Sequence, residues 1–174
     1  MRYYTIQVKT RSELKFMRFY RVLYHNKPLN LYFPRKEIPQ RRLGVMTNKV
    51  RAVLPGYIFI ELPEENSIAE YYWELRRTPG FFRFLVSNRD IQPLAGKELE
   101  MVLYLLKAVG PVAGISKASF DENSRIVVLE GPLKGFEGRI IKVDKRKGRA
   151  RVQLDLYNES HWIDLAFQTI ARSS

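Results

Sequence analysis

VRAVLPGYIFIEL, residues 50–62, is the stretch that decides the fold of this chain. Residues 57–62 are aromatic, aliphatic or β-branched apart from Glu61, a composition typical of a buried strand. Pro55 lacks a backbone donor and Gly56 tolerates a positive φ, so we expect the chain to bend where it enters this strand. Leu54 and Tyr57 then either cap the core or form an apolar docking patch, and the residues leave both possibilities open.

The composition indicates a globular and strongly basic protein. The 174 residues are 45% hydrophobic and 13% aromatic, which is enough for a packed core in one domain or two small ones. Lys and Arg number 30 against 18 Asp and Glu, a formal net charge of +12. This imbalance favours nucleic acid as the partner, although a merely soluble basic protein or one that binds acidic membrane has a similar composition.

Several chemistries are excluded or disfavoured. The chain has no cysteine, so it has no disulfide, thiolate metal site or cysteine nucleophile. The N-terminus lacks the apolar stretch of a signal peptide, and no apolar run approaches the roughly 20 residues that span a bilayer, so we expect a cytoplasmic protein with no membrane partner. His25 and His161 lack partners at metal-ligand spacing, and Gly131, Gly135 and Gly138 lack the Gly-Lys-Ser/Thr of a phosphate loop. We expect no metal, no cofactor and no catalysis.

The first 107 residues predict alternating strands and helices. Besides the central strand, strands are expected over 3–9, 29–38 with a bend at Pro34, and 81–86, with a polar hairpin tip over 39–49. Apolar residues at helical spacing predict helices over 13–25, 67–77 and 96–107. This β-α-β-β-α-β-α order indicates an α+β fold with helices on one face of an antiparallel sheet.

The second half differs in character. Turn-forming residues dominate 109–123, which we expect to be a flexible linker. Five short strands are expected beyond it, over 125–129, 138–143, 149–154, 161–165 and 168–170, a number typical of a small β-barrel. The sequence therefore predicts two domains, residues 1–108 and 124–174, joined by residues 109–123.

Two predicted surfaces are cationic. The polar side of helix 13–25 has no acid and either is only solvated or contacts phosphates. The hairpin expected over 139–151, with its turn at Lys145–Gly148, contains a single acid, Asp144. It is either a solvated tip or a surface that binds RNA or phosphate. Its cations are Arg139, Lys142, Lys145, Arg146, Lys147, Arg149 and Arg151.

Several motifs resemble the NusG family of transcription factors. The N-terminal half resembles the NusG N-terminal (NGN) domain in its Tyr3-Tyr4 opening, its Leu54-Pro55-Gly56-Tyr57 turn, its Thr78-Pro79-Gly80-Phe81 segment and Pro93-Leu94. Residues 127–139 look like a KOW motif, and residues 164–168 resemble the closing strand of that domain. The resemblance covers nearly the whole chain. It implies an NGN domain, a KOW domain with an SH3-like five-stranded barrel, and a monomeric, non-catalytic transcription elongation and antitermination factor.

The resemblance also implies partners. In that family the N-terminal domain binds the clamp helices of the largest RNA polymerase subunit and suppresses pausing. Matched by position, the polymerase contacts would be Tyr3, Leu54, Pro55, Gly56, Tyr57 and Phe59. Upstream or non-template DNA would face Lys9, Arg11, Lys15 and Arg18. The KOW domain would recruit Rho or a ribosomal small-subunit protein through Phe136, or an RNA hairpin through Lys142, Lys145, Arg146, Lys147, Arg149 and Arg151.

The chain departs from the family pattern at a few positions. Tyr3 stands where Trp is common, and Leu54 replaces the usual Phe, which leaves the shape of the apolar depression open. The basic hairpin is closer to specialised paralogues of the RfaH and LoaP types. In the RfaH type the C-terminal domain can become a helical hairpin, but the β-branched residues here favour a stable barrel. The alternative is a basic ribosome-associated RNA-binding protein with a KOW barrel, which does not explain the apolar patch.

Overall fold

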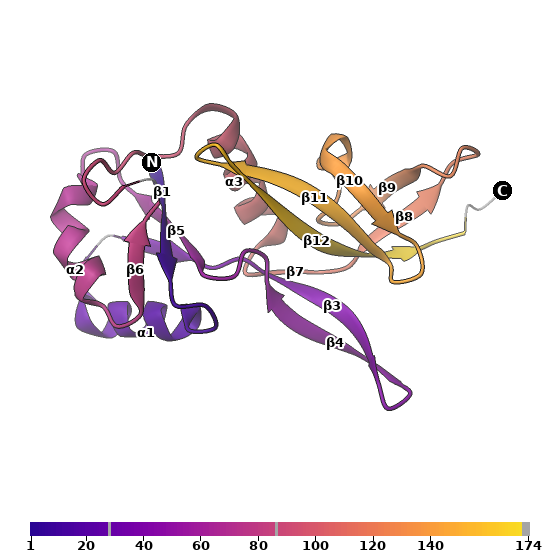
Figure 1. The fold of residues 1–174 in the computed structure, drawn as a ribbon, viewed down its shortest axis with the longest axis horizontal. Helices are drawn as coiled ribbons and strands as arrows, with labels where there is room; N and C mark the ends of the chain where they lie inside the picture. The colour runs from indigo at the N-terminus through magenta and orange to yellow at the C-terminus, as the bar shows by residue number, and fades with distance from the viewer. Residues whose placement is uncertain (28, 86, 172–174) are drawn as a thin grey trace. The chain divides into compact units, whose positions relative to one another are not determined.

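The computed structural model describes residues 1–27, 29–85 and 87–171. The chain divides into two compact units, which we describe separately. Unit 1 contains Met1–Phe33 and Leu54–Glu100, and unit 2 contains Pro34–Val53 and Met101–Ser174. Figure 1 shows the ribbon. No helix in the described part of the chain is long and apolar enough to cross a membrane.

Unit 1 is built on a four-stranded antiparallel sheet in the order β2-β5-β1-β6. The strands are β1 (Arg2–Val8), β2 (Asn30–Tyr32), β5 (Tyr57–Leu62) and β6 (Phe81–Phe84). The helices are α1 (Glu13–Leu23), the 3₁₀ turn η1 (Ile68–Tyr71) and α2 (Tyr72–Arg77). The central strand of the sequence analysis is thus β5, paired on both sides, and the predicted α+β class is confirmed.

The core of unit 1 lies between one face of this sheet and the helices (Figure 1). Because side chains alternate along a strand, every second residue of β1 and β5 reaches the same face. The members from these strands are Tyr4, Ile6, Val8, Ile58, Ile60 and Leu62. The helices contribute residues at the predicted spacing, among them Phe16, Tyr20 and Leu75. Helical periodicity therefore identified Phe16 and Tyr20 as buried, but Leu23, predicted on the same side of α1, is 54% exposed.

Unit 2 begins with an inserted hairpin. β3 (Arg35–Arg42) and β4 (Val45–Ala52) pair over their full length and project as a two-stranded arm (Figure 1). The chain turns at Leu43-Gly44, both with positive φ, and β7 (Val112–Ala113) pairs in parallel with β3. The predicted strand 29–38 is therefore two strands in different sheets, because Pro34 ends the first pairing. The helix α3 (Gly96–Val109) includes the boundary between the units.

The second sheet of unit 2 is a curled five-stranded sheet in the order β10-β11-β12-β8-β9. Its strands are β8 (Ser116–Phe120), β9 (Ile126–Glu130), β10 (Ile140–Asp144), β11 (Arg149–Leu156) and β12 (Glu159–Thr169), with the short turn η2 (Glu137–Arg139) before β10. The predicted strand count is confirmed, but the members differ. The last two predicted strands are one strand, β12, and the fifth strand is β8, inside the segment expected to be a linker. β8 was missed because its small and polar residues, SKASF, have weak strand periodicity.

Candidate functional site

The bend at residues 54–57 is fixed by a glycine and a buried carboxylate. Gly56 has a φ of +82°, and a Cβ there would lie 3.0 Å from Thr10 Oγ1 and 3.2 Å from the carbonyl oxygen of Val8, so only glycine fits without strain. The Gly56 N–H donates to Glu13 Oε1 at 2.7 Å. Glu13 is only 4% exposed. The first residue of α1 therefore anchors the turn, a contact between distant segments that local sequence patterns do not signal.

A groove of about 520 Å³ lies beside this bend, at one end of the sheet of unit 1. Its lining comes from the end of β1, the bend and the start of β6, and includes Lys9, Pro55 and Phe82. Phe82 is 71% exposed and Pro55 is also exposed. An exposed aromatic ring beside a cation and a proline makes this groove suitable for contact with a macromolecule.

The sheet face opposite the core carries paired polar groups. The hydroxyls of Tyr3 and Tyr32 both donate to Glu61 Oε2, at 3.0 and 2.9 Å. Burial and the Glu61 carboxylate raise the pKa of Tyr3 to about 12, so its hydroxyl stays a donor at neutral pH. Further along, Gln7 Nε2 donates to the Tyr57 hydroxyl at 2.8 Å, and Arg83 Nε donates to Gln7 Oε1 at 2.6 Å.

The residues matched to polymerase contacts are exposed to different degrees. Pro55 is exposed, and Tyr3 and Tyr57 are half-buried. Leu54 and Phe59 are 4% and 0% exposed, and Gly56 is buried. Leu54 thus lies inside, and of the pair Leu54 and Tyr57 only Tyr57 reaches the surface. The polymerase role of this set stays a prediction.

The residues matched to DNA contacts all lie at the surface. Lys9, Arg11, Lys15 and Arg18 are exposed, and none of them forms an ion pair with another described residue. Lys15 Nζ lies 5.5 Å from the centroid of the Phe19 ring. Two of these cations precede α1 and two lie on its exposed side, so this surface carries the positive charge that the sequence predicts.

A second cationic feature of unit 1 was not identified from the sequence. On α2, the indole of Trp73 is 61% exposed, and the guanidinium groups of Arg76 and Arg77 lie 5.6 and 5.8 Å from its centroid. The spacing of Trp73 to Arg76 and Arg77, i+3 and i+4 on a helix, is the signal that could have revealed it.

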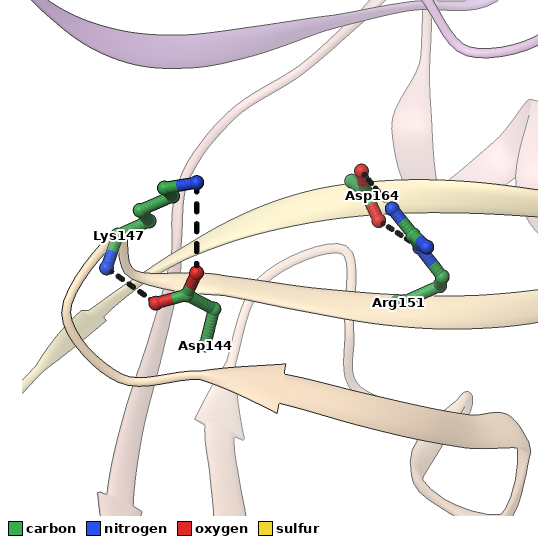
Figure 2. A network of polar contacts seen from close by, with 4 residues as sticks. All are labelled: Asp144, Lys147, Arg151 and Asp164. Carbon is green, nitrogen blue, oxygen red and sulfur yellow. Dashed lines mark hydrogen bonds and ion pairs between the residues drawn. The ribbon is translucent and has the colours of Figure 1, made fainter.

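In unit 2 the predicted turn at Lys145–Gly148 is confirmed as the tip between β10 and β11. Lys145 Nζ lies 4.1 Å from the centroid of the Phe120 ring, a cation–π contact. The backbone N–H of Lys147 donates to Asp144 Oδ1 at 2.9 Å, and its Nζ lies 4.0 Å from Asp144 Oδ2 (Figure 2). Arg146 is exposed. The tip therefore presents one cation, Arg146, that forms no ion pair with another described residue, beside two lysines that are held by contacts with Phe120 and Asp144.

Next to this tip, the tertiary fold places the acid Asp164 and the lysine Lys36 close to the cations of β11. Arg151 forms a bidentate pair with Asp164, at 2.7 and 3.1 Å, across β11 and β12 (Figure 2). These hydrogen bonds hold the pKa of Asp164 below its usual range. Lys36, on β3, is 9% exposed, and burial lowers its pKa to about 8, with Asp164 acting in the opposite direction. Neither Lys36 nor Asp164 was identified from the sequence.

The other predicted contact residues of unit 2 differ in accessibility. Lys142 and Arg151 are exposed and Arg149 is half-buried. Phe136 is 2% exposed and packs edge-to-face against Tyr104 of α3, with ring centroids 4.8 Å apart. In this structure Phe136 therefore offers no surface to a partner. Among the described residues, no group of three His, Asp or Glu side chains could hold a metal ion.

Comparisons with known proteins agree with this architecture. Residues 1–103 match the family model for transcription termination factor nusG, and residues 122–155 match the KOW motif. The chain is 25% identical to the transcription termination/antitermination protein NusG of Thermus thermophilus, covering 85% of this chain and 83% of the relative. It is 26% identical to that of Buchnera aphidicola, covering 80% and 76%.

A solved structure shows the same fold. The structure titled "Domain interaction in Thermotoga maritima NusG" matches with a TM-score of 0.54 and 18% sequence identity, and the match covers 95% of this chain and 93% of that one. The NGN-like and KOW-like halves predicted from the sequence are thus both matched, in the same order. The chain belongs to the NusG family of transcription termination and antitermination factors.

Proposed function

We propose that this protein is a non-catalytic, cytoplasmic transcription elongation and antitermination factor that binds the clamp helices of the largest RNA polymerase subunit and suppresses pausing. Residues 1–108 would form the polymerase-binding domain and residues 124–174 the recruiting domain, connected by 109–123. The observation that carries the proposal is the match of both halves to NusG and KOW models on one chain. Similarity to transcription proteins along most of the chain favours this role over that of a ribosome-associated protein.

The surface proposed for the polymerase surrounds the bend at residues 54–57. Tyr57 and Tyr3 offer partly exposed rings on one sheet face, and Pro55 is exposed at its end. Leu54 and Phe59 are buried and would support this surface from within. The fixed turn holds these groups in one geometry before binding, which lowers the entropy that binding must overcome.

Nucleic acid would be contacted by separate surfaces of the two units. The exposed Lys9, Arg11, Lys15 and Arg18 would face upstream or non-template DNA. The exposed cations of the β10–β11 tip would bind RNA. Because Phe136 is buried against Tyr104, a protein partner such as Rho or a ribosomal small-subunit protein would have to displace Tyr104 in order to reach Phe136.

The experiment that tests the proposal is binding of the full chain to RNA polymerase, with Tyr57→Ala beside Tyr57→Phe. Removal of a ring at an interface hot spot costs about 2 kcal/mol or more, so Tyr57→Ala should weaken binding roughly 30-fold or more. Tyr57→Phe keeps the ring and loses the hydroxyl, which accepts a hydrogen bond from Gln7, so it should bind within a few-fold of the wild type. Equal binding by both variants and the wild type, with circular dichroism unchanged, would exclude this surface as the polymerase contact.

A further inference from the structure

A basic groove runs between the inserted hairpin and the five-stranded sheet of unit 2. It consists of two adjoining cavities of about 300 and 190 Å³. The larger is lined by Lys36, Ile38, Gln40 and Arg51 from β3 and β4, and by Arg149 and Asp164 from β11 and β12. The smaller shares Arg149 and Asp164 and adds Lys142, Asp144, Lys147 and Arg151. The groove therefore has six cations in its walls and two acids.

The two acids are already engaged within the protein. Asp164 accepts both hydrogen bonds of the Arg151 guanidinium, and Asp144 accepts the backbone N–H of Lys147. The other four cations of the groove form no ion pair with another described residue. They are Lys36, Arg51, Lys142 and Arg149. Its net charge favours an anionic ligand.

Two cations of the groove, Lys36 and Arg149, have too few hydrogen-bond or charge partners among the described residues for their degree of burial. Lys36 is nearly buried, and this burial disfavours its charged form. Asp164 favours the charged form, whereas the neighbouring Arg149, Arg151 and Arg51 disfavour it. The Nε of Arg149 is buried, and among the described residues it finds no hydrogen-bond acceptor. A buried cation and an unpaired buried donor both lower stability unless an acceptor reaches them. An oxygen-rich anion would satisfy both.

An aromatic platform adjoins the groove. Trp162 is 62% exposed and lies two residues before Asp164 on β12, so its side chain points to the same face of the sheet. It pairs with Gln153, and is therefore the diagonal neighbour of Arg151 on the adjacent strand. Phosphate-binding cations beside an exposed ring on which a base can stack are the combination used to bind single-stranded nucleic acid.

We propose that this groove binds a backbone phosphate of single-stranded RNA, held by Lys36, Arg51 and Arg149, while an adjacent base stacks on Trp162. The inference rests on the proposed RNA-binding role of unit 2 and deepens it. It moves part of the binding from the exposed hairpin tip to a groove that includes the inserted β3–β4 hairpin. In this arrangement the cations of the tip attract the RNA, and the groove holds its backbone in one position.

The test is fluorescence anisotropy of the full chain with a labelled 12-nucleotide single-stranded RNA across a salt series. Lys36→Met keeps the apolar stem and should weaken binding about tenfold and reduce the slope of log K against log salt by about 0.7, as loss of one phosphate contact requires. Lys134→Met is the matched control, because Lys134 is exposed, does not line the groove, and donates from its Nζ to the Leu129 carbonyl. It should bind like the wild type at moderate salt.

The aromatic platform has its own pair of variants. Trp162→Ala should weaken binding at least fivefold, the lower limit for loss of one base-stacking contact of about 1 kcal/mol. Trp162→Phe should retain most of the affinity. If Lys36→Met does not fold by circular dichroism, the exposed Arg51→Gln is used in its place, with Arg125→Gln as its control.

Several outcomes would overturn the inference, and they separate it from the proposed function. If a Lys145/Arg146→Ala variant, which leaves every lining residue of the groove in place, loses RNA while Lys36→Met and Arg51→Gln bind like their controls, the tip binds RNA and the groove does not. If the wild type binds DNA of the same sequence more tightly than RNA, the assignment to RNA is wrong. If the wild type binds no RNA, both the groove and the tip proposals fail, and polymerase binding is still decided by the Tyr57 variants.

Discussion

Replacement of Glu13 tests how the bend at residues 54–57 is held. The Glu13 carboxylate accepts the N–H of Gly56 at 2.7 Å in a buried environment. A hydrogen bond to a charged group contributes about 1.5–3 kcal/mol, because its loss leaves a buried donor unpaired. Glu13 is also the first residue of α1, where a carboxylate adds about 0.3–1 kcal/mol through the helix dipole. Glu13→Ala should therefore lower the free energy of unfolding of unit 1 by roughly 2–4 kcal/mol.

Glu13→Gln separates these contributions. The amide keeps an acceptor for Gly56 but loses the charge, and neutral hydrogen bonds are about half as strong, so the expected loss is about 1–2 kcal/mol. Glu65→Ala, at an exposed position, is the control and should leave stability unchanged within error. The ranking of the three variants therefore reports the buried hydrogen bond and not a general effect of losing an acid.

The assay is urea unfolding followed by tryptophan fluorescence. The chain has two tryptophans, Trp73 in unit 1 and Trp162 in unit 2. Trp162→Phe as background therefore leaves Trp73 to report on unit 1 alone, and hydrogen exchange of the Gly56 amide gives a local measurement of the same bond. A loss below about 1 kcal/mol for Glu13→Ala, or unchanged protection of the Gly56 amide, would refute the reasoning.

Two further changes test other parts of unit 2. Gly148→Ala should lower the melting temperature, because Gly148 has a φ of +60° and a Cβ there would lie 2.5 Å from the Phe167 carbonyl oxygen. Gly138→Ala is the control and should leave the melting temperature unchanged, because the space around Gly138 is open. Equal melting temperatures for the two variants would contradict this prediction. The pKa of Lys36 is lowered from 10.5 to about 8, so the unfolded chain binds more protons between these values and stability should rise with pH through that window. Lys36→Met should remove this rise in urea unfolding at several pH values, and an unchanged pH profile in the variant would show that Lys36 is not its source.

Local sequence patterns predicted much of unit 1. The apolar run of residues 57–62 indicated a buried strand, which is β5, and the spacing of Phe16 and Tyr20 identified two buried residues of α1. The proline and glycine of the bend marked where β5 begins, because φ is restricted at one and free at the other. Apolar runs, helical spacing and a proline–glycine bend each depend on a few adjacent residues, so they can be recognised in the sequence alone.

Long-range pairing was less accessible. The small residues of β8 lack the apolar alternation of a strand, and this segment becomes a strand only because β12 and β9 supply its hydrogen bonds. Pro34 suggested a bend, but not that the residues after it leave the sheet of β2 for another one. β-Strand formation depends on neighbours that can be far away in the chain, so periodicity alone cannot assign such partners.

The sequence by itself determined the α+β class, the positive charge and the positions of the exposed cations in and just before α1 and at the β10–β11 tip. Only the tertiary structure decided that Glu13 holds Gly56, that Phe136 is covered by Tyr104, and that Lys36 lies beside Asp164 and Arg149. The physical reason is that burial and hydrogen bonding between distant residues depend on how whole elements pack. Which polar groups meet is therefore settled after the local structure has formed.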